Sequence, residues 1–111
     1  MAETFNRSAL ELPASLTNAY VAPNNASTDR AIVLSVLVAN VDGSNAATLR
    51  AQVFDAGGNS LSHLAYDIAV PAGASLELIS NKLVLLNGDV LKLQAGAASD
   101  LEAVVSVLEI T

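Results

Sequence analysis

The sequence predicts an all-β protein, an antiparallel β-sandwich that is jelly-roll-like and has about eight strands. Residues that reverse the chain recur about every ten positions, which is typical of sandwiches and barrels. The segments between these turns are short and rich in leucine and β-branched residues. No long window between turns carries an apolar stripe with the 3.6-residue period of a helix, so no helix longer than two turns is expected.

Turn chemistry sets the order of the elements. Each turn contains a proline, which fixes φ, or a glycine or asparagine, which tolerates positive φ. The extended segments between the turns are Thr4–Leu12, Leu16–Val21, Arg30–Val41, Ala46–Asp55, Ser60–Val70, Ser75–Ile79, Lys82–Leu86, Asp89–Ala95 and Asp100–Ile110. Asn87-Gly88 stands between two apolar runs and predicts a tight hairpin with a type I′ turn. We assign all segments to one domain, residues 1–111, because a chain of this length has no room for a second core.

Alternation along the strands predicts which side chains form the core of the subunit. The residues expected to be buried share one face of their strands; they are Ile32, Leu34, Val36, Leu49, Val53, Leu91, Leu93, Val105 and Val107. Truncating Val105 or Leu34 to alanine should therefore cost about 2–4 kcal/mol of stability.

Two predicted strands, Arg30–Val41 and Asp100–Ile110, are apolar on both faces. A sandwich buries only one face of each sheet, so the second apolar face must be covered by something else. We expect a second copy of the chain or another protein to cover it, with a trimer as the first expectation. The residues that represent this interface are Val33, Leu37, Val104 and Leu108. In the alternative, some strands bend between the sheets or alanine-rich outer faces tolerate water.

Composition narrows the function classes. The chain has 111 residues with a net charge of −6 and only five lysines and arginines, which argues against nucleic acid or an anionic membrane as a partner. It has no cysteine, so disulfides and thiolate metal sites are excluded. The first twenty residues lack the apolar stretch of a secretory signal, and no apolar run is long enough for a membrane-spanning helix.

A search for catalytic or ligand-binding chemistry yields no site, so no enzyme activity, catalytic residue, cofactor or metal is expected. His63 is the single histidine, with Ser60 and Ser62 nearby, but these residues lie in a predicted strand and not in a strained turn. The loops that begin at Asp42 and Asp55 each offer one carboxylate, too few for calcium, so turn formation is the better interpretation.

Five segments in a fixed order resemble small virion structural proteins of tailed bacteriophages, which include decoration-type proteins. These segments are YVAP at 20–23, VANVDG at 38–43, VPAGASLEL at 70–78, KLVLLNGDVLKL at 82–93 and SVLEIT at 106–111. The resemblance covers nearly the whole chain, and its motifs are specific as an ordered set.

The resemblance implies a non-enzymatic part of a phage particle, and a capsid decoration or cement protein is the favoured role. It also implies that the major capsid protein or other virion proteins are partners, and that the protein is made in the host cytoplasm. The net charge of −6 favours the particle exterior, away from DNA. Neck or head–tail joining proteins, tail or fibre adaptors and receptor-binding modules remain as alternatives.

Overall fold

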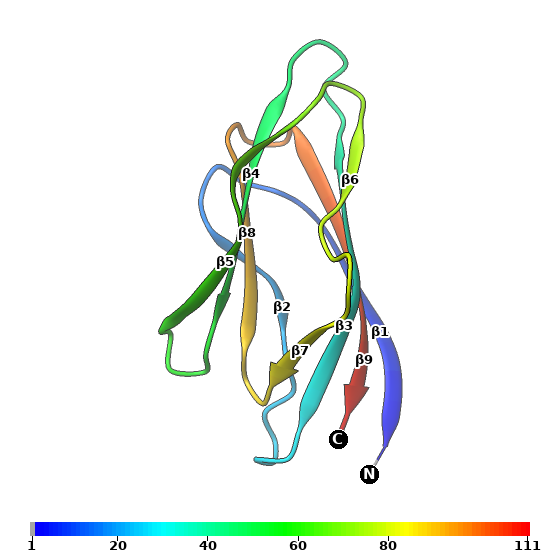
Figure 1. The fold of residues 1–111 in the computed structure, drawn as a ribbon, viewed down its shortest axis with the longest axis vertical. Helices are drawn as coiled ribbons and strands as arrows, with labels where there is room; N and C mark the ends of the chain where they lie inside the picture. The colour runs from blue at the N-terminus through cyan, green and yellow to red at the C-terminus, as the bar shows by residue number, and fades with distance from the viewer. Residues whose placement is uncertain (1) are drawn as a thin grey trace.

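The computed structural model describes residues 2–111 as two antiparallel sheets packed face to face (Figure 1). The strands are β1 (Glu3–Glu11), β2 (Thr17–Val21), β3 (Arg30–Asn40), β4 (Ala47–Phe54), β5 (Ser60–Val70), β6 (Ser75–Glu77), β7 (Leu83–Leu86), β8 (Val90–Ala95) and β9 (Leu101–Ile110). No helix occurs among the described residues, so none could cross a membrane. The predicted all-β sandwich is confirmed, with nine strands where about eight were expected.

Strand order identifies the sandwich as a jelly roll. Sheet A has the order β1-β9-β3-β6, and β7 pairs with β3 further along the same edge. Sheet B has the order β2-β8-β4-β5. The chain crosses from one sheet to the other at most connections, and the two ends of the chain lie side by side because β1 pairs with β9 (Figure 1).

The core lies between the inner faces of the two sheets. Seven of the nine predicted core residues are buried there: Val36, Leu49, Val53, Leu91, Leu93, Val105 and Val107. Full burial of leucine or valine contributes roughly 1.5–3 kcal/mol per side chain, so these residues hold the two layers together.

The prediction was wrong for Ile32 and Leu34, which are only half-buried, and for Val33, which is fully buried. The cause is a β-bulge in β3, where the pairing with β9 shifts between Val33 and Ser35. One extra residue reverses the alternation, so Val33 points into the core before the bulge and Val36 points into it afterwards. Val33 therefore cannot represent an outer interface.

The predicted hairpin at Asn87-Gly88 was also wrong. β7 belongs to sheet A and β8 to sheet B, so this turn carries the chain between layers. Asp89 N–H donates to the carbonyl of Leu86 (3.0 Å), and Gly88 alone in the turn has positive φ (77°). These features belong to a type II turn, because type I′ requires positive φ at both central residues.

Polar side chains close the ends of the sandwich. The amide of the buried Asn40 donates to the carbonyls of Asn45 (3.0 Å) and Val70 (2.9 Å), and its Oδ1 accepts from the N–H of Asp42. At the other end, the hydroxyl of Tyr20 in sheet B donates to Glu109 Oε2 in sheet A (2.5 Å). Burial, reinforced by the hydrogen bond and charge of Glu109, raises the pKa of Tyr20. These bonds fix the two sheets relative to each other.

Candidate assembly surface

The outer face of sheet A carries side chains in rows that run across the strands, because the register aligns outward-pointing positions. One row is apolar on all four strands: Phe5 on β1, Leu108 on β9, Ile32 on β3 and Val84 on β7. The Phe5 side chain is 77% exposed and Val84 is 59% exposed, whereas the two central residues are half-buried. This row is the widest apolar strip on the outer surface of the sheet.

A second row lies four residues further along β1 and β9. It consists of Ala9, Val104, Leu37 and Glu77. Leu37 is 44% exposed and Val104 is 39% exposed. Five of the nine large apolar side chains that are exposed in the described residues lie on this one face: Phe5, Leu37, Val84, Leu86 and Val104.

Three of the four residues that the sequence proposes for the interface are brought together here. Leu37 and Val104 are paired in the register, and Leu108 lies four residues further along β9. The sequence reasoning missed Phe5, Val84 and Leu86. Phe5 lies in a strand that alternates polar and apolar residues, and Val84 and Leu86 lie in a short apolar run. Neither local pattern predicts that these residues lie on the same face as Leu108.

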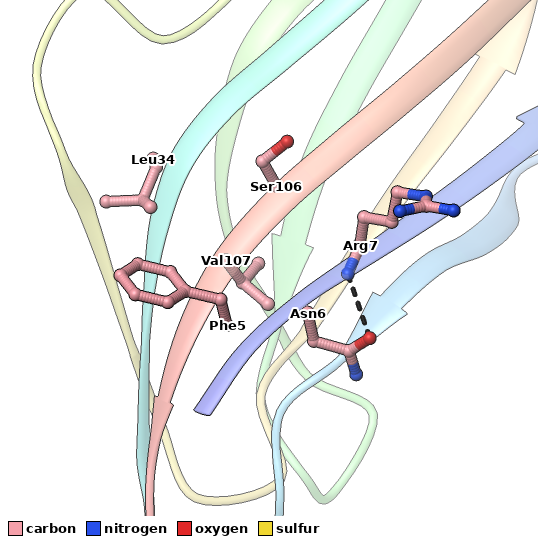
Figure 2. Close-up of a pocket in the computed structure, with 6 residues that line it drawn as sticks. All are labelled: Phe5, Asn6, Arg7, Leu34, Ser106 and Val107. Carbon is pink, nitrogen blue, oxygen red and sulfur yellow. Dashed lines mark hydrogen bonds between the residues drawn. The ribbon is translucent and has the colours of Figure 1, made fainter. Parts of the chain in front are cut away.

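Between the two rows, the surface forms a shallow, open depression lined in part by Phe5, Arg7, Leu34 and Ser106 (Figure 2). The bulge places Leu34 here, and the ring of Phe5 lies toward it across β9 (Figure 2). The backbone N–H of Arg7 donates to Asn6 Oδ1 (2.8 Å). The Asn6 side chain therefore satisfies a backbone donor on the free edge of β1.

Glu77 fixes a negative charge at the opposite side of the same face. Its carboxylate accepts hydrogen bonds from the hydroxyl of Ser35 and from the backbone N–H groups of Val36 (2.9 Å) and Ile79 (3.1 Å). Burial acts to raise its pKa, but these bonds outweigh burial and hold the pKa below its usual value. Glu77 is therefore ionised at neutral pH.

The outer face of sheet B also carries apolar side chains, because the register aligns Val21, Val90 and Phe54, but the charged groups below find partners within the chain. Arg50 forms a two-pronged ion pair with Asp67 (3.1 and 2.8 Å) and lies 4.4 Å from the ring centre of Tyr66. The ammonium of Lys92 lies 4.5 Å from the ring centre of Phe54. These cations therefore have partners within the same sheet.

The candidate catalytic and calcium-binding residues take part in strand and turn contacts. The ring of His63 packs edge to face against Tyr66, with 5.1 Å between ring centres. The nearby serines do not bond to the imidazole: Ser62 donates to the carbonyl of His63, and Ser60 accepts from Gln52.

The two aspartates considered for calcium close their own loops. Asp42 accepts from the N–H of Ser44 (2.8 Å) and Asp55 from that of Asn59 (2.9 Å), and these bonds lower the pKa of each carboxyl. Across residues 2–111, no three histidine, cysteine or acidic side chains group together in a way that could hold a metal ion.

Neither a protein-family model nor a curated protein sequence matches this chain, but solved structures share its fold. A chain of the disulfide-linked pili of Bacillus endospore appendages is 15% identical, with a TM-score of 0.58 over 99% of this chain and 87% of that chain. A chain of the acid-stable capsid of Helicobacter pylori bacteriophage KHP30 is 13% identical, with a TM-score of 0.53 over 100% and 89%.

A chain of the T13 viral particle of IBDV is 9% identical, with a TM-score of 0.57 over 97% of this chain and 31% of that chain. These similarities show that the fold is the jelly roll found in viral and phage capsid proteins and in appendage pili. The three chains compared come from pili, a phage capsid and a viral particle.

Proposed function

We propose that this chain is a non-enzymatic structural protein of a bacteriophage virion, a capsid decoration or cement protein on the particle exterior. The single observation that carries the proposal is the apolar outer face of sheet A, which a protein in water covers by assembly. The jelly-roll fold shared with a phage capsid chain and the ordered motifs of phage structural proteins support it. The net charge of −6 suits an exterior position away from DNA.

The proposed partners are other copies of the chain and the major capsid protein. Each large apolar side chain removed from water contributes roughly 1.5–3 kcal/mol, against about 4–15 kcal/mol for the lost freedom of association. The face offers enough apolar side chains for self-association, and the sequence-based expectation is a trimer, which suits the three-fold positions of a capsid. Neck, head–tail joining, tail, fibre-adaptor and receptor-binding roles would use the same face on a different partner.

A subunit of a surface appendage is a second candidate, favoured by the similarity to the endospore pili. Those pili are described as disulfide-linked, and these 111 residues contain no cysteine. An appendage built from this chain would therefore depend on non-covalent contacts.

The test is the double variant Leu37→Lys with Leu108→Lys, measured by light scattering for mass and circular dichroism for fold. We expect the wild type to be oligomeric, and the variant to be folded but monomeric and absent from assembled particles. The matched control, Thr48→Lys with Leu61→Lys, adds the same charge to exposed positions of sheet B and should leave the mass unchanged. A Leu37/Leu108 variant that keeps the wild-type mass and still joins the particle would overturn the proposal.

The position in the virion is tested by a cryo-EM map of intact particles, in which copies of the sandwich are counted and located. Density on the outer shell at the capsid lattice points supports decoration. Density confined to the neck, tail or fibre assigns the chain to one of the alternative roles.

A further inference from the structure

We infer that two copies of this chain pack their sheet A outer faces together about a two-fold axis that runs parallel to the strands and passes between β3 and β9. This inference rests on the proposed self-association and replaces the trimer expected from the sequence with a two-fold pair.

The apolar row is complementary to itself under this axis. The order of strands across the row is β1, β9, β3 and β7, so the rotation exchanges the two outer strands and the two central strands. Phe5 then lies over Val84 of the second copy, and Leu108 lies over Ile32 of the second copy. Every position of the row meets an apolar side chain, and the two most exposed members cover each other.

The same rotation brings opposite charges together. Arg7 is exposed and makes no ion pair within residues 2–111, and the register places it in one row with Ser106 and Ser35. The carboxylate of Glu77 is held at this row by its bonds to Ser35 and Val36, at the other side of the face. The axis therefore sets Arg7 of each copy against Glu77 of the other, and the contact occurs twice.

A two-fold axis perpendicular to the strands gives the opposite result. If it passes through the row of Arg7 and Ser106, it places Arg7 against Arg7 of the second copy. It also places Glu3 against Glu11 at the free edge, since these residues lie at equal distances from that row. Pairs of like charge across an interface are unfavourable, so charge selects the axis that runs parallel to the strands.

The area of the face matches that of a stable pair. With strands about 4.8 Å apart and a rise of about 3.3 Å per residue, four strands of roughly nine residues cover about 600 Å² in projection. Projecting side chains such as Phe5 enlarge the accessible area beyond that value, toward the ~800 Å² per partner of a standard interface. Two twisted sheets of this kind pack at about 30° to each other, which keeps the central rows in contact.

Cross-linking between single-cysteine chains tests the geometry, because the natural chain has no cysteine. Packed sheets lie about 10 Å apart, beyond the reach of a disulfide, so the probe is a short bis-maleimide that joins two thiols. Phe5→Cys chains mixed with Val84→Cys chains should give a two-chain product. Phe5→Cys alone should not, because β1 of one copy lies about 14 Å sideways from β1 of the other. The control mixture of Phe5→Cys with Leu61→Cys places one thiol on sheet B and should remain uncross-linked.

Charge reversal provides an independent measurement. Arg7→Glu should weaken the pair by about tenfold or more, because it sets two carboxylates against each other at two places. Adding Glu77→Arg to the same chain should restore the affinity, provided that circular dichroism shows an unchanged fold.

The outcomes separate this inference from the proposed function. A mass of two chains together with the Phe5–Val84 product supports the pair. A mass of three chains, or cross-linking of Phe5→Cys with itself, overturns the pair and leaves self-association intact. A monomer without cross-links overturns both the pair and self-association in solution, while the presence of the chain on virions tests the structural role separately.

Discussion

On the outer face of sheet B, the charged side chains find partners within the same chain, whereas on sheet A the exposed side chains form apolar rows flanked by charges at the edges. Arg50 on sheet B is paired with Asp67 and stacked on Tyr66. Arg7 on sheet A has no such ion pair within the described residues. The difference supports the proposal that the sheet A face, and not the sheet B face, is covered in an assembly.

The largest expected effect lies in the core that both sheets share. Leu91 in sheet B and Val105 in sheet A are fully buried, so Leu91→Ala and Val105→Ala should each reduce the free energy of unfolding by about 2–4 kcal/mol. Leu34→Ala on the outer face should cost only about 1 kcal/mol, because this side chain is half-exposed. Urea unfolding of the three variants checks the ranking. An equal cost for Leu34 and Leu91 would mean that the outer face of sheet A belongs to the core.

The contrast between the faces could be predicted from the sequence only in part. Turn residues predicted nine extended segments, and each forms a strand with no boundary more than two residues from its position in the structure. The faces of β3 could not be predicted, because a bulge at Leu34 depends on pairing with β9, about seventy residues away. The row that joins Phe5 to Val84 also depends on register between distant strands, which the local pattern does not encode.

The Asn87-Gly88 turn between β7 and β8 is the position where a substitution should have the next largest effect on stability. Gly88 has φ of 77°, and a Cβ there would lie 2.7 Å from Cβ of Ala56 and 2.8 Å from Nδ2 of Asn24. Gly88→Ala should therefore cost about 2–4 kcal/mol, from left-handed strain together with the steric clash. Gly58→Ala is the matched control, because Gly58 has a similar φ (84°) with nothing within 4 Å of the added Cβ. Thermal unfolding should show a clearly smaller loss for Gly58→Ala, and equal losses would contradict the close approach at Gly88.

The two arginines test the comparison directly. Arg50→Ala removes an exposed ion pair within the chain, so it should lower the stability of the monomer slightly and leave the mass of the assembly unchanged. Arg7→Ala should leave the stability of the monomer unchanged and weaken association. Urea unfolding at protein concentrations too low for association measures the stability of the monomer. Sedimentation at higher concentrations measures association, so the two effects are separated. If Arg7→Ala destabilised the monomer as much as Arg50→Ala, the sheet A face would be another self-contained surface.

The smallest expected effect is the response of Glu77 to acid. The hydrogen bonds from Ser35, Val36 and Ile79 lower the pKa of this carboxyl against the opposing effect of burial. A group whose pKa is lower in the folded state stabilises the protein fully above its unfolded pKa of 4.5, and this contribution is lost as the pH falls through the folded value. Between pH 6 and pH 3, the melting temperature of the wild type should therefore fall more than that of Glu77→Gln. The gap should be small, because Glu77 is exposed and water screens its bonds.

Asp42→Asn is the control, since Asp42 also has a lowered pKa but lies in a loop away from the sheet A face. It should reduce the acid sensitivity of folding in the same way without changing association, whereas Glu77→Gln should weaken association even at neutral pH. If the two variants affected association equally, Glu77 would be only a local cap of β3, and the charge complementarity of the face would lose its basis.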